Sequence, residues 1–181
     1  MTTIAYRDGI MAADSQVTGG DVVRGTAKKI FRINDLLVAC CGGSDEAEEF
    51  RQWLRAGAAQ GDRPRFRDDS RFSAMTVDAD GAVNIWNKFC VPQLADAPFH
   101  ALGSGNELAL GAMAFGASAE QAVNVACSLD IYSGGPIQVE YLHANANAGR
   151  SAEIIEVPAK FKAKAKAAVA AMARGPVGDL S

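Results

Sequence analysis

The feature that most constrains this chain is an Asp-Gly pair close to its start, Asp8-Gly9, which separates two short apolar runs. Asp and Gly tolerate the positive φ angles that a two-residue hairpin turn requires. The sequence therefore predicts two antiparallel strands, Ile4–Tyr6 and Ile10–Ala13, and the first of them begins almost at the first residue. Chain ends are usually loose, whereas a strand at this point holds the α-amine in a sheet. No signal peptide is expected before it.

A fixed α-amine beside a hydroxyl group indicates a candidate nucleophile. Thr2 becomes the first residue if Met1 is removed, which a small second residue permits. An unperturbed α-amine has a pKa of roughly 7.7–8.0, so it can take the proton from the Oγ1 of its own residue near neutral pH. Asp14 ends the second strand and Lys29 begins the third apolar run, and such a charge pair would lower the pKa of the hydroxyl. In a plainer interpretation Thr2 is an edge-strand residue, Asp14 a strand-end cap and Lys29 a solvated charge.

Composition favours one globular domain over residues 1–181, because 49% of the residues are hydrophobic and 22% are charged. The net charge of −3 argues against nucleic-acid binding. No apolar run approaches the ~20 residues of a membrane span. The cysteines and histidines lack metal-ligand spacing, so we expect no metal, no other cofactor, and reduced thiols in the cytoplasm. These residues are Cys40, Cys41, Cys90, Cys127, His100 and His143.

Hydrophobic periodicity and turn residues predict the remaining elements. Strands are predicted at Lys29–Ile33, Leu36–Cys41, Ser73–Val77, Ala82–Trp86, Phe99–Leu102, Ile137–Leu142 and Glu153–Val157. Helices are predicted from Ser44, over Glu107–Phe115, after the capping box of Ser118 and Gln121, and over Lys160–Arg174 within a C-terminal Ala/Lys helix and tail at 158–181. The segment Thr18–Thr26 and the segment between Pro92 and Pro98 are predicted to be loops. Strands that come in runs favour antiparallel sheets covered by helices.

Several motifs in a fixed order resemble those of proteasome β-type subunits, most closely the bacterial HslV-like branch. Thr2-Thr3-Ile4 and the Asp8-Gly9 hairpin are followed by Ala-Asp-Ser-Gln-Val-Thr at 13–18 and by Lys-Lys-Ile at 28–30. Gly103-Ser104-Gly105 precedes a helix of small residues, and Asp-Ile-Tyr-Ser-Gly-Gly at 130–135 follows the next helix. A Gly-x-Gly pattern by itself is weak evidence for a phosphate loop, and no Walker lysine follows it.

The resemblance implies an α+β fold, the four-layer αββα sandwich of N-terminal nucleophile hydrolases. It also implies that Thr2 is the nucleophile, with Asp14 and Lys29 as the neighbouring charge pair. Asp130 and Ser133 would orient the amine and its proton network.

Three further expectations concern the surroundings of this site. The oxyanion would be held by a backbone N–H near the end of the strand Leu37–Cys41, with Ala39 and Cys40 as candidates, because the glycine usual in this turn is not found there. In the helix-opening motif Gly103, Ser104, Gly105 and Asn106, an Asn stands where a Ser is often present. The first hairpin is shorter than usual, and strand residues advance by roughly 3.3 Å each. The shortening could therefore draw Thr2 away from Lys29.

By resemblance, the chain is a threonine-type peptidase that cleaves polypeptides inside a homo-oligomeric ring. An ATP-dependent unfoldase would feed such a ring, since this chain carries no nucleotide motif. Two alternatives remain open at this stage. One is a catalytically inactive structural or assembly protein with the same fold, of phage or prophage origin. The other is an amidase of the same superfamily that acts on small molecules.

Overall fold

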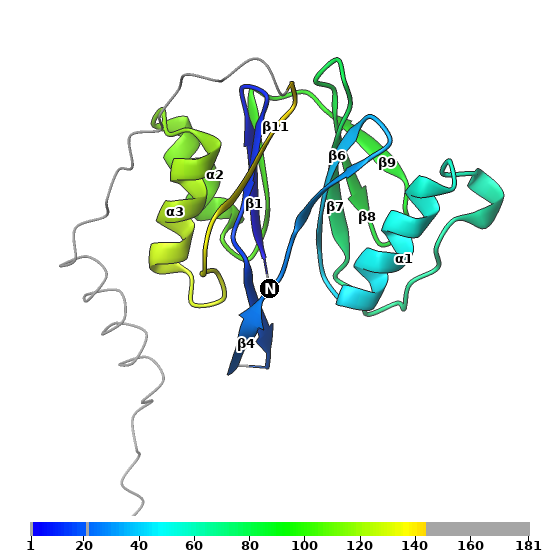
Figure 1. The fold of residues 1–181 in the computed structure, drawn as a ribbon, viewed down its shortest axis with the longest axis horizontal. Coiled ribbons are helices and arrows are strands. Elements are labelled where there is room, and N and C mark those ends of the chain that lie inside the picture. Colours follow the sequence, from blue (N-terminus) through cyan, green and yellow to red (C-terminus); the bar gives the residue numbers. More distant parts are fainter. Residues whose placement is uncertain (1, 21, 144–181) are drawn as a thin grey trace, which may run out of the picture.

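Two antiparallel β-sheets lie face to face in the computed structural model, which describes residues 2–20 and 22–143 (Figure 1). The first sheet has the strand order β10-β1-β2-β11 and the second β5-β6-β7-β8-β9. The first consists of β1 (Thr3–Arg7), β2 (Ile10–Ala13), β10 (Phe99–Gly103) and β11 (Gln138–Tyr141). The second consists of β5 (Ile30–Ile33), β6 (Leu36–Cys41), β7 (Ser73–Val77), β8 (Val83–Asn87) and β9 (Pro92–Ala95).

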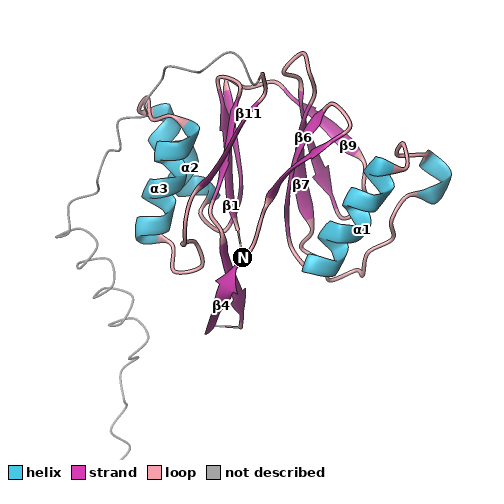
Figure 2. Cartoon of the chain, in the orientation of Figure 1, coloured by secondary structure: helices cyan, strands magenta, loops and turns pink. Residues whose placement is uncertain are grey.

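Helices cover the outer face of each sheet (Figure 2). Helix α1 (Ser44–Arg55) packs outside the second sheet, followed by the short 3-10 turn Gln60–Asp62, and α2 (Asn106–Ala114) and α3 (Ala119–Leu129) pack outside the first. The order of layers is helix, sheet, sheet, helices, which confirms the expected α+β αββα sandwich. The predicted strand Glu153–Val157 and the helix Lys160–Arg174, within 158–181, lie outside the described residues.

The predicted first hairpin is confirmed. Asp8 and Gly9 have φ angles of 51° and 75°, the left-handed values that a two-residue turn between twisted strands requires. β1 and β2 pair from Ile4 opposite Ala13 to Arg7 opposite Ile10. The turn of this hairpin therefore consists of two residues, and the strands on either side of it pair in a continuous register.

Successive side chains of each strand point to opposite faces of its sheet. The buried side chains therefore form one core between the two sheets and two cores between a sheet and its helices. Ile4 of β1 and Leu37 of β6 are fully buried in the inter-sheet core, whereas Ala5 faces α2 and α3. Val38 and Cys40 of β6 face α1, which packs its Phe50 against them. Adjacent residues of β6 thus point to opposite sides of the second sheet.

Two loop predictions are wrong. Residues of the predicted loop Thr18–Thr26 form most of a two-stranded ribbon, β3 (Gln16–Gly19) paired with β4 (Val22–Thr26), which projects from the sandwich (Figure 1). Every residue of β4 is exposed, so the ribbon has no buried face and leaves no alternating pattern in the sequence. The segment after Pro92 forms the edge strand β9, where a proline is tolerated at the first position.

In the described part of the chain, none of the helices combines the length and the hydropathy that crossing a bilayer requires.

Candidate functional site

Backbone hydrogen bonds hold the first residues of the chain in the sheet. The N–H of Ser104 donates to the carbonyl oxygen of Thr2 over 2.9 Å, and the N–H of Asp14 donates to the carbonyl oxygen of Thr3 over 3.1 Å. Gly103 has φ of 95°, and a Cβ at this position would lie 1.7 Å from the Thr2 oxygen. Only glycine therefore lets β10 approach Thr2 so closely. Thr2 itself is only 8% exposed.

The predicted charge pair forms next to this strand. Lys29 Nζ lies 2.8 Å from Asp14 Oδ1 and also donates to the carbonyl oxygen of Gln16 over 2.7 Å. The side chains of Lys29 and Asp14 are 8% and 0% exposed, so the interpretation of Lys29 as a solvated charge is wrong. Asp14 Oδ1 also accepts from the N–H of Thr3 over 2.8 Å, and its Oδ2 accepts from the N–H groups of Gln16 and Gly134, each over 3.1 Å.

A second polar cluster joins the start of β1 to the end of α3. The hydroxyls of Ser104 and Ser133 each lie 2.6 Å from Asp130 Oδ2. Thr3 Oγ1 lies 2.5 Å from Ser133 Oγ and accepts from the N–H of Gly105 over 3.0 Å. Because Ser133 gives its single proton to the carboxylate, the Thr3 hydroxyl must donate to Ser133. The cluster is thus a directed chain of hydrogen bonds that ends on Asp130.

Both clusters converge on Thr3. Its N–H bonds Asp14 and its hydroxyl bonds Ser133, so Thr3 joins the two groups of predicted site residues. Asp130 and Ser133 were expected to orient the Thr2 amine, but their side-chain contacts given above are with Thr3 and Ser104. Thr3 was not among the predicted site residues, and its only signal in the sequence was the Thr-Thr pair. Asn106 is the half-buried first residue of α2.

The described chain begins at the end of the sandwich from which the β3–β4 ribbon projects (Figure 1). A cavity of about 350 Å³ opens beside Thr2. Its walls come from the β3–β4 ribbon, the segment before β5, the end of β6 and the start of α1. They comprise Thr2, Gln16, Val17, Thr18, Ala27, Lys28, Lys29, Cys40, Gly42, Gly43, Ser44, Ala47 and Arg51. Thr2 and Lys29 share this cavity, so the short hairpin has not moved them to different parts of the surface.

The two oxyanion candidates, Ala39 and Cys40, lie differently relative to this cavity. Ala39 is fully buried within β6, paired with strands on both sides, and does not line the cavity, whereas Cys40 does. The strand ends at Cys41 and turns at Gly42, whose φ is 116°. Gly42 thus lies just beyond the segment in which the oxyanion donor was expected. The N–H of Gly43 is bonded to Glu46 Oε2 over 3.1 Å.

The two cysteines near Thr2, Cys40 and Cys41, are poor nucleophiles. Burial raises the pKa of Cys40 to about 12, partly opposed by the charge of Arg51. Burial likewise raises the pKa of Cys41 to about 12, partly opposed by the charge of Lys29. Since the thiolate is the reactive form, both groups remain inert thiols at neutral pH.

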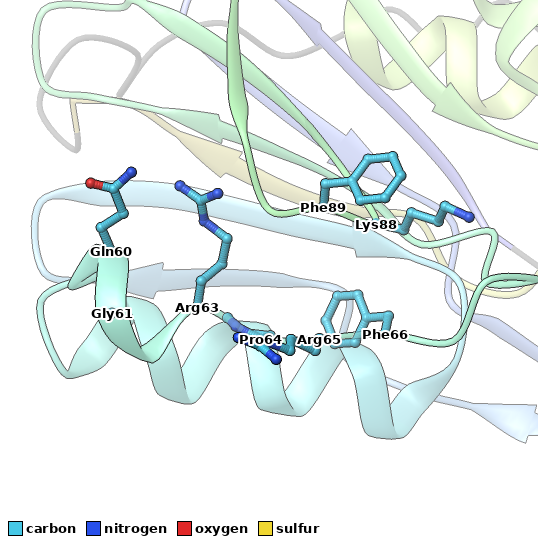
Figure 3. Close-up of a pocket in the computed structure, with 8 residues that line it drawn as sticks. All are labelled: Gln60, Gly61, Arg63, Pro64, Arg65, Phe66, Lys88 and Phe89. Carbon is cyan, nitrogen blue, oxygen red and sulfur yellow. The ribbon is translucent and has the colours of Figure 1, made fainter.

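Two other features of the surface are separate from this site. Across residues 2–20 and 22–143, no group of three or more His, Cys, Asp and Glu side chains is arranged to hold a metal ion. A second cavity of about 340 Å³ lies between the segment after α1 and the residues that follow β8, where Arg63 and Phe66 face Lys88 and Phe89 (Figure 3). None of the predicted site residues lines it.

The fold is similar to that of solved proteasome-type structures. Thiobacillus denitrificans BPH in complex with epoxomicin matches with a TM-score of 0.56 and 22% identity, over 78% of this chain and 98% of that chain. Eukaryotic HslV from Trypanosoma brucei matches with a TM-score of 0.56 and 22% identity, over 76% and 97% of the two chains. No protein family model matches the sequence, and no curated protein matches it. By its architecture, the chain has the fold of proteasome β-type and HslV-like subunits.

Proposed function

We propose that this chain is a threonine-type peptidase whose nucleophile is Thr2 after removal of Met1. The observation that carries the proposal is the buried ion pair of Lys29 and Asp14, because it keeps an ammonium group in the wall of the same cavity as Thr2. A buried charge is costly unless it is paired. An ammonium near a hydroxyl group lowers the pKa of that hydroxyl, which is the effect that a weak oxygen nucleophile needs.

The proposed reaction has two halves. The free amine of Thr2 takes the proton of Oγ1, and Oγ1 attacks the carbonyl carbon of a peptide bond. The oxygen of the tetrahedral intermediate takes up negative charge, and the N–H of Gly42 in the cavity wall is the proposed donor to it. The amine then returns the proton to the leaving nitrogen, which leaves an ester on Thr2. Water, deprotonated by the same amine, hydrolyses the ester.

Thr3 and its partners have a positioning role in this proposal. The hydrogen bonds to Asp14 and Ser133 fix the peptide unit that carries Thr2, so the nucleophile is held without contacting those groups itself. Pre-organised geometry of this kind avoids a reorganisation cost during the reaction.

The assembly and setting of the enzyme are part of the same proposal. Copies of the chain would form a ring that encloses the cavities, with polypeptides as substrates and an ATP-dependent unfoldase as partner in the cytoplasm. The β3–β4 ribbon offers a contact surface, since Val22 and Val23 are 57% and 59% exposed. Exposed apolar side chains on a projecting ribbon favour packing against another protein surface.

The test begins with the intact mass of the purified protein, which we expect to lack Met1. A panel of fluorogenic peptides should then be hydrolysed by wild type and by Thr2→Ser, but not by Thr2→Ala. Epoxomicin gives a second readout, since BPH forms a complex with it. It should raise the melting temperature of wild type more than that of Thr2→Ala. Hydrolysis by Thr2→Ala at the wild-type rate would contradict the role of Thr2.

If the protein lacks Met1 but cleaves no peptide, the two alternatives remain, a small-molecule amidase and an inactive structural or assembly protein. A screen of small amides then separates an amidase from an inactive structural protein. The Thr2→Ala variant serves as the blank in both assays.

A further inference from the structure

The walls of the cavity beside Thr2 carry an uneven distribution of charge. Among the residues that the structure describes, three cationic side chains line it, those of Lys28, Lys29 and Arg51, and no carboxylate does. The ammonium of Lys29 is balanced by Asp14, which is fully buried beneath it. Arg51 is also paired, with Glu48, whose side chain is 46% exposed and lies outside the cavity, so Arg51 and Lys28 are the cations that would face an incoming group.

The guanidinium of Arg51 is held in place by a ring on one side and a carboxylate on the other. Its central carbon lies 4.2 Å from the centroid of the Phe31 ring, and its Nη2 and Nε donate to Glu48 Oε2 over 2.6 and 3.2 Å. The side chain of Arg51 is only 14% exposed, whereas that of Glu48 is 46% exposed. Glu48 does not line the cavity, so it orients the guanidinium from outside.

Arg51 retains donors for a ligand. A guanidinium has five N–H donors; Glu48 engages two of them, and the Cys40 sulfur is a further partner. Lys28 Nζ lies 5.6 Å from the same Phe31 ring centroid, so both cations are gathered around one aromatic side chain. The neighbouring acids of α1, Asp45 and Glu46, lie near Gly43 but are not cavity residues.

We propose that this cavity selects an aspartate or glutamate side chain on the residue whose carbonyl Thr2 attacks. The inference rests on the proposed peptidase function, because the side chain of the attacked residue is the one nearest to the nucleophile. Small wall residues, Cys40 and Ala47, leave room for it within about 350 Å³. The carboxylate binds Arg51, with Lys28 at the rim, and a basic side chain at the same position is repelled.

The size of the preference follows from the type of bond. A hydrogen bond between charged groups contributes more than a neutral one, and its loss corresponds to about a 10-fold to 100-fold change in an equilibrium or rate constant. Glutamine has nearly the shape of glutamate without its charge. The ratio of the two therefore isolates the electrostatic part.

The first experiment compares the kcat/KM of the trimmed protein for acetylated fluorogenic tripeptides that differ only in the residue before the cleaved bond. We expect glutamate to exceed glutamine by about 10-fold to 100-fold and lysine to be slowest. Arg51→Met should lower the glutamate-to-glutamine ratio about tenfold, and Arg51→Lys should keep most of it. The matched control is Arg55→Met, since Arg55 also pairs with Glu48 on α1, at 3.3 Å, but does not line the cavity. A wild-type ratio near one, or a ratio that Arg51→Met leaves unchanged, overturns the proposal.

A binding experiment separates this inference from the proposed chemistry. Tripeptide amides ending in glutamate or glutamine are titrated into the Thr2→Ala protein, with circular dichroism to verify that each Arg51 variant is folded. Tighter binding of the glutamate peptide that Arg51→Met abolishes supports the selectivity, even if wild type cleaves no peptide and only the peptidase proposal fails. Equal affinities, or no binding of the glutamate peptide, overturn the selectivity.

Discussion

Replacing Asp14 by Asn tests the arrangement beside Thr2 most directly. The carboxylate accepts four hydrogen bonds, from Lys29 Nζ and the N–H groups of Thr3, Gln16 and Gly134. An amide keeps one acceptor oxygen and puts an NH₂ donor in place of the other. Each carboxylate oxygen accepts from two donors, so in Asp14→Asn one pair of donors faces the NH₂ group, whichever way the amide is turned. The buried ammonium of Lys29 also loses its counter-ion.

The expected cost follows from these contacts. Removing one partner of a buried ion pair costs about 3–5 kcal/mol, because it leaves an uncompensated charge in the interior. Lys29 Nζ still reaches the carbonyl oxygen of Gln16 at 2.7 Å, so we expect the free energy of unfolding to fall by about 3 kcal/mol. Urea denaturation followed by circular dichroism measures it. The matched control is Asp69→Asn in the exposed pair with Arg67, which should cost less than about 1 kcal/mol.

A double-mutant cycle then tests the coupling. Lys29→Met leaves Asp14 with three backbone donors, so the single change should cost less than Asp14→Asn. The double variant should be more stable than the sum of the two single costs predicts, because no unpaired charge remains. Additive costs, or a loss below about 1 kcal/mol in Asp14→Asn, would refute the reasoning that a tightly coupled pair supports the site.

Three further predictions concern the surroundings of the pair. Ser133→Ala removes the acceptor of the Thr3 hydroxyl and should lower the free energy of unfolding by about 1–3 kcal/mol, as measured by urea denaturation. An unchanged urea midpoint would exclude this hydrogen bond as a stabilising contact. Gly103→Ala should lower the melting temperature far more than Gly116→Ala. Both residues have similar φ angles, 95° and 98°, but of the two only Gly103 has atoms within 4 Å of an added Cβ. Equal shifts in melting temperature would contradict this expectation. The pKa of Cys40 is raised by burial from an ordinary value of 9.0 to about 12, so its contribution to stability is complete below pH 9.0 and is lost as pH rises towards 12. Cys40→Ala should flatten the fall in unfolding free energy over that interval, and an identical pH profile would contradict this.

Turns and helix starts whose conformation depends on residues close by in the sequence were predictable from the sequence. The turn at Asp8-Gly9 depends on two residues that accept positive φ, and the start of α3 depends on the reciprocal bonds of Ser118 and Gln121. In both cases the physical cause lies within a few positions of the effect. The pairing of Asp14 with Lys29 was expected by resemblance, and the structure brings the two side chains together.

Features that depend on distant partners were not predictable in this way. The β3–β4 ribbon buries no face, so periodicity gives no sign of it. The position of Gly42 at the cavity depends on where β6 ends, and the pairing partners in β5 and β7 decide that end. Thr3 was missed because its side-chain partner, Ser133, is 130 positions away.

These long separations bear on how the protein is made. Thr2 leaves the ribosome among the first residues, yet the two partners of the neighbouring Thr3 hydroxyl, Gly105 and Ser133, are 102 and 130 positions later than Thr3 in the chain. In a nascent chain the Thr3 hydroxyl therefore lacks the partners that it has in the folded protein. The N–H of Gly134 is one of the four donors to Asp14, so the hydrogen bonds around this buried carboxylate are complete only after the chain has been synthesised through Gly134.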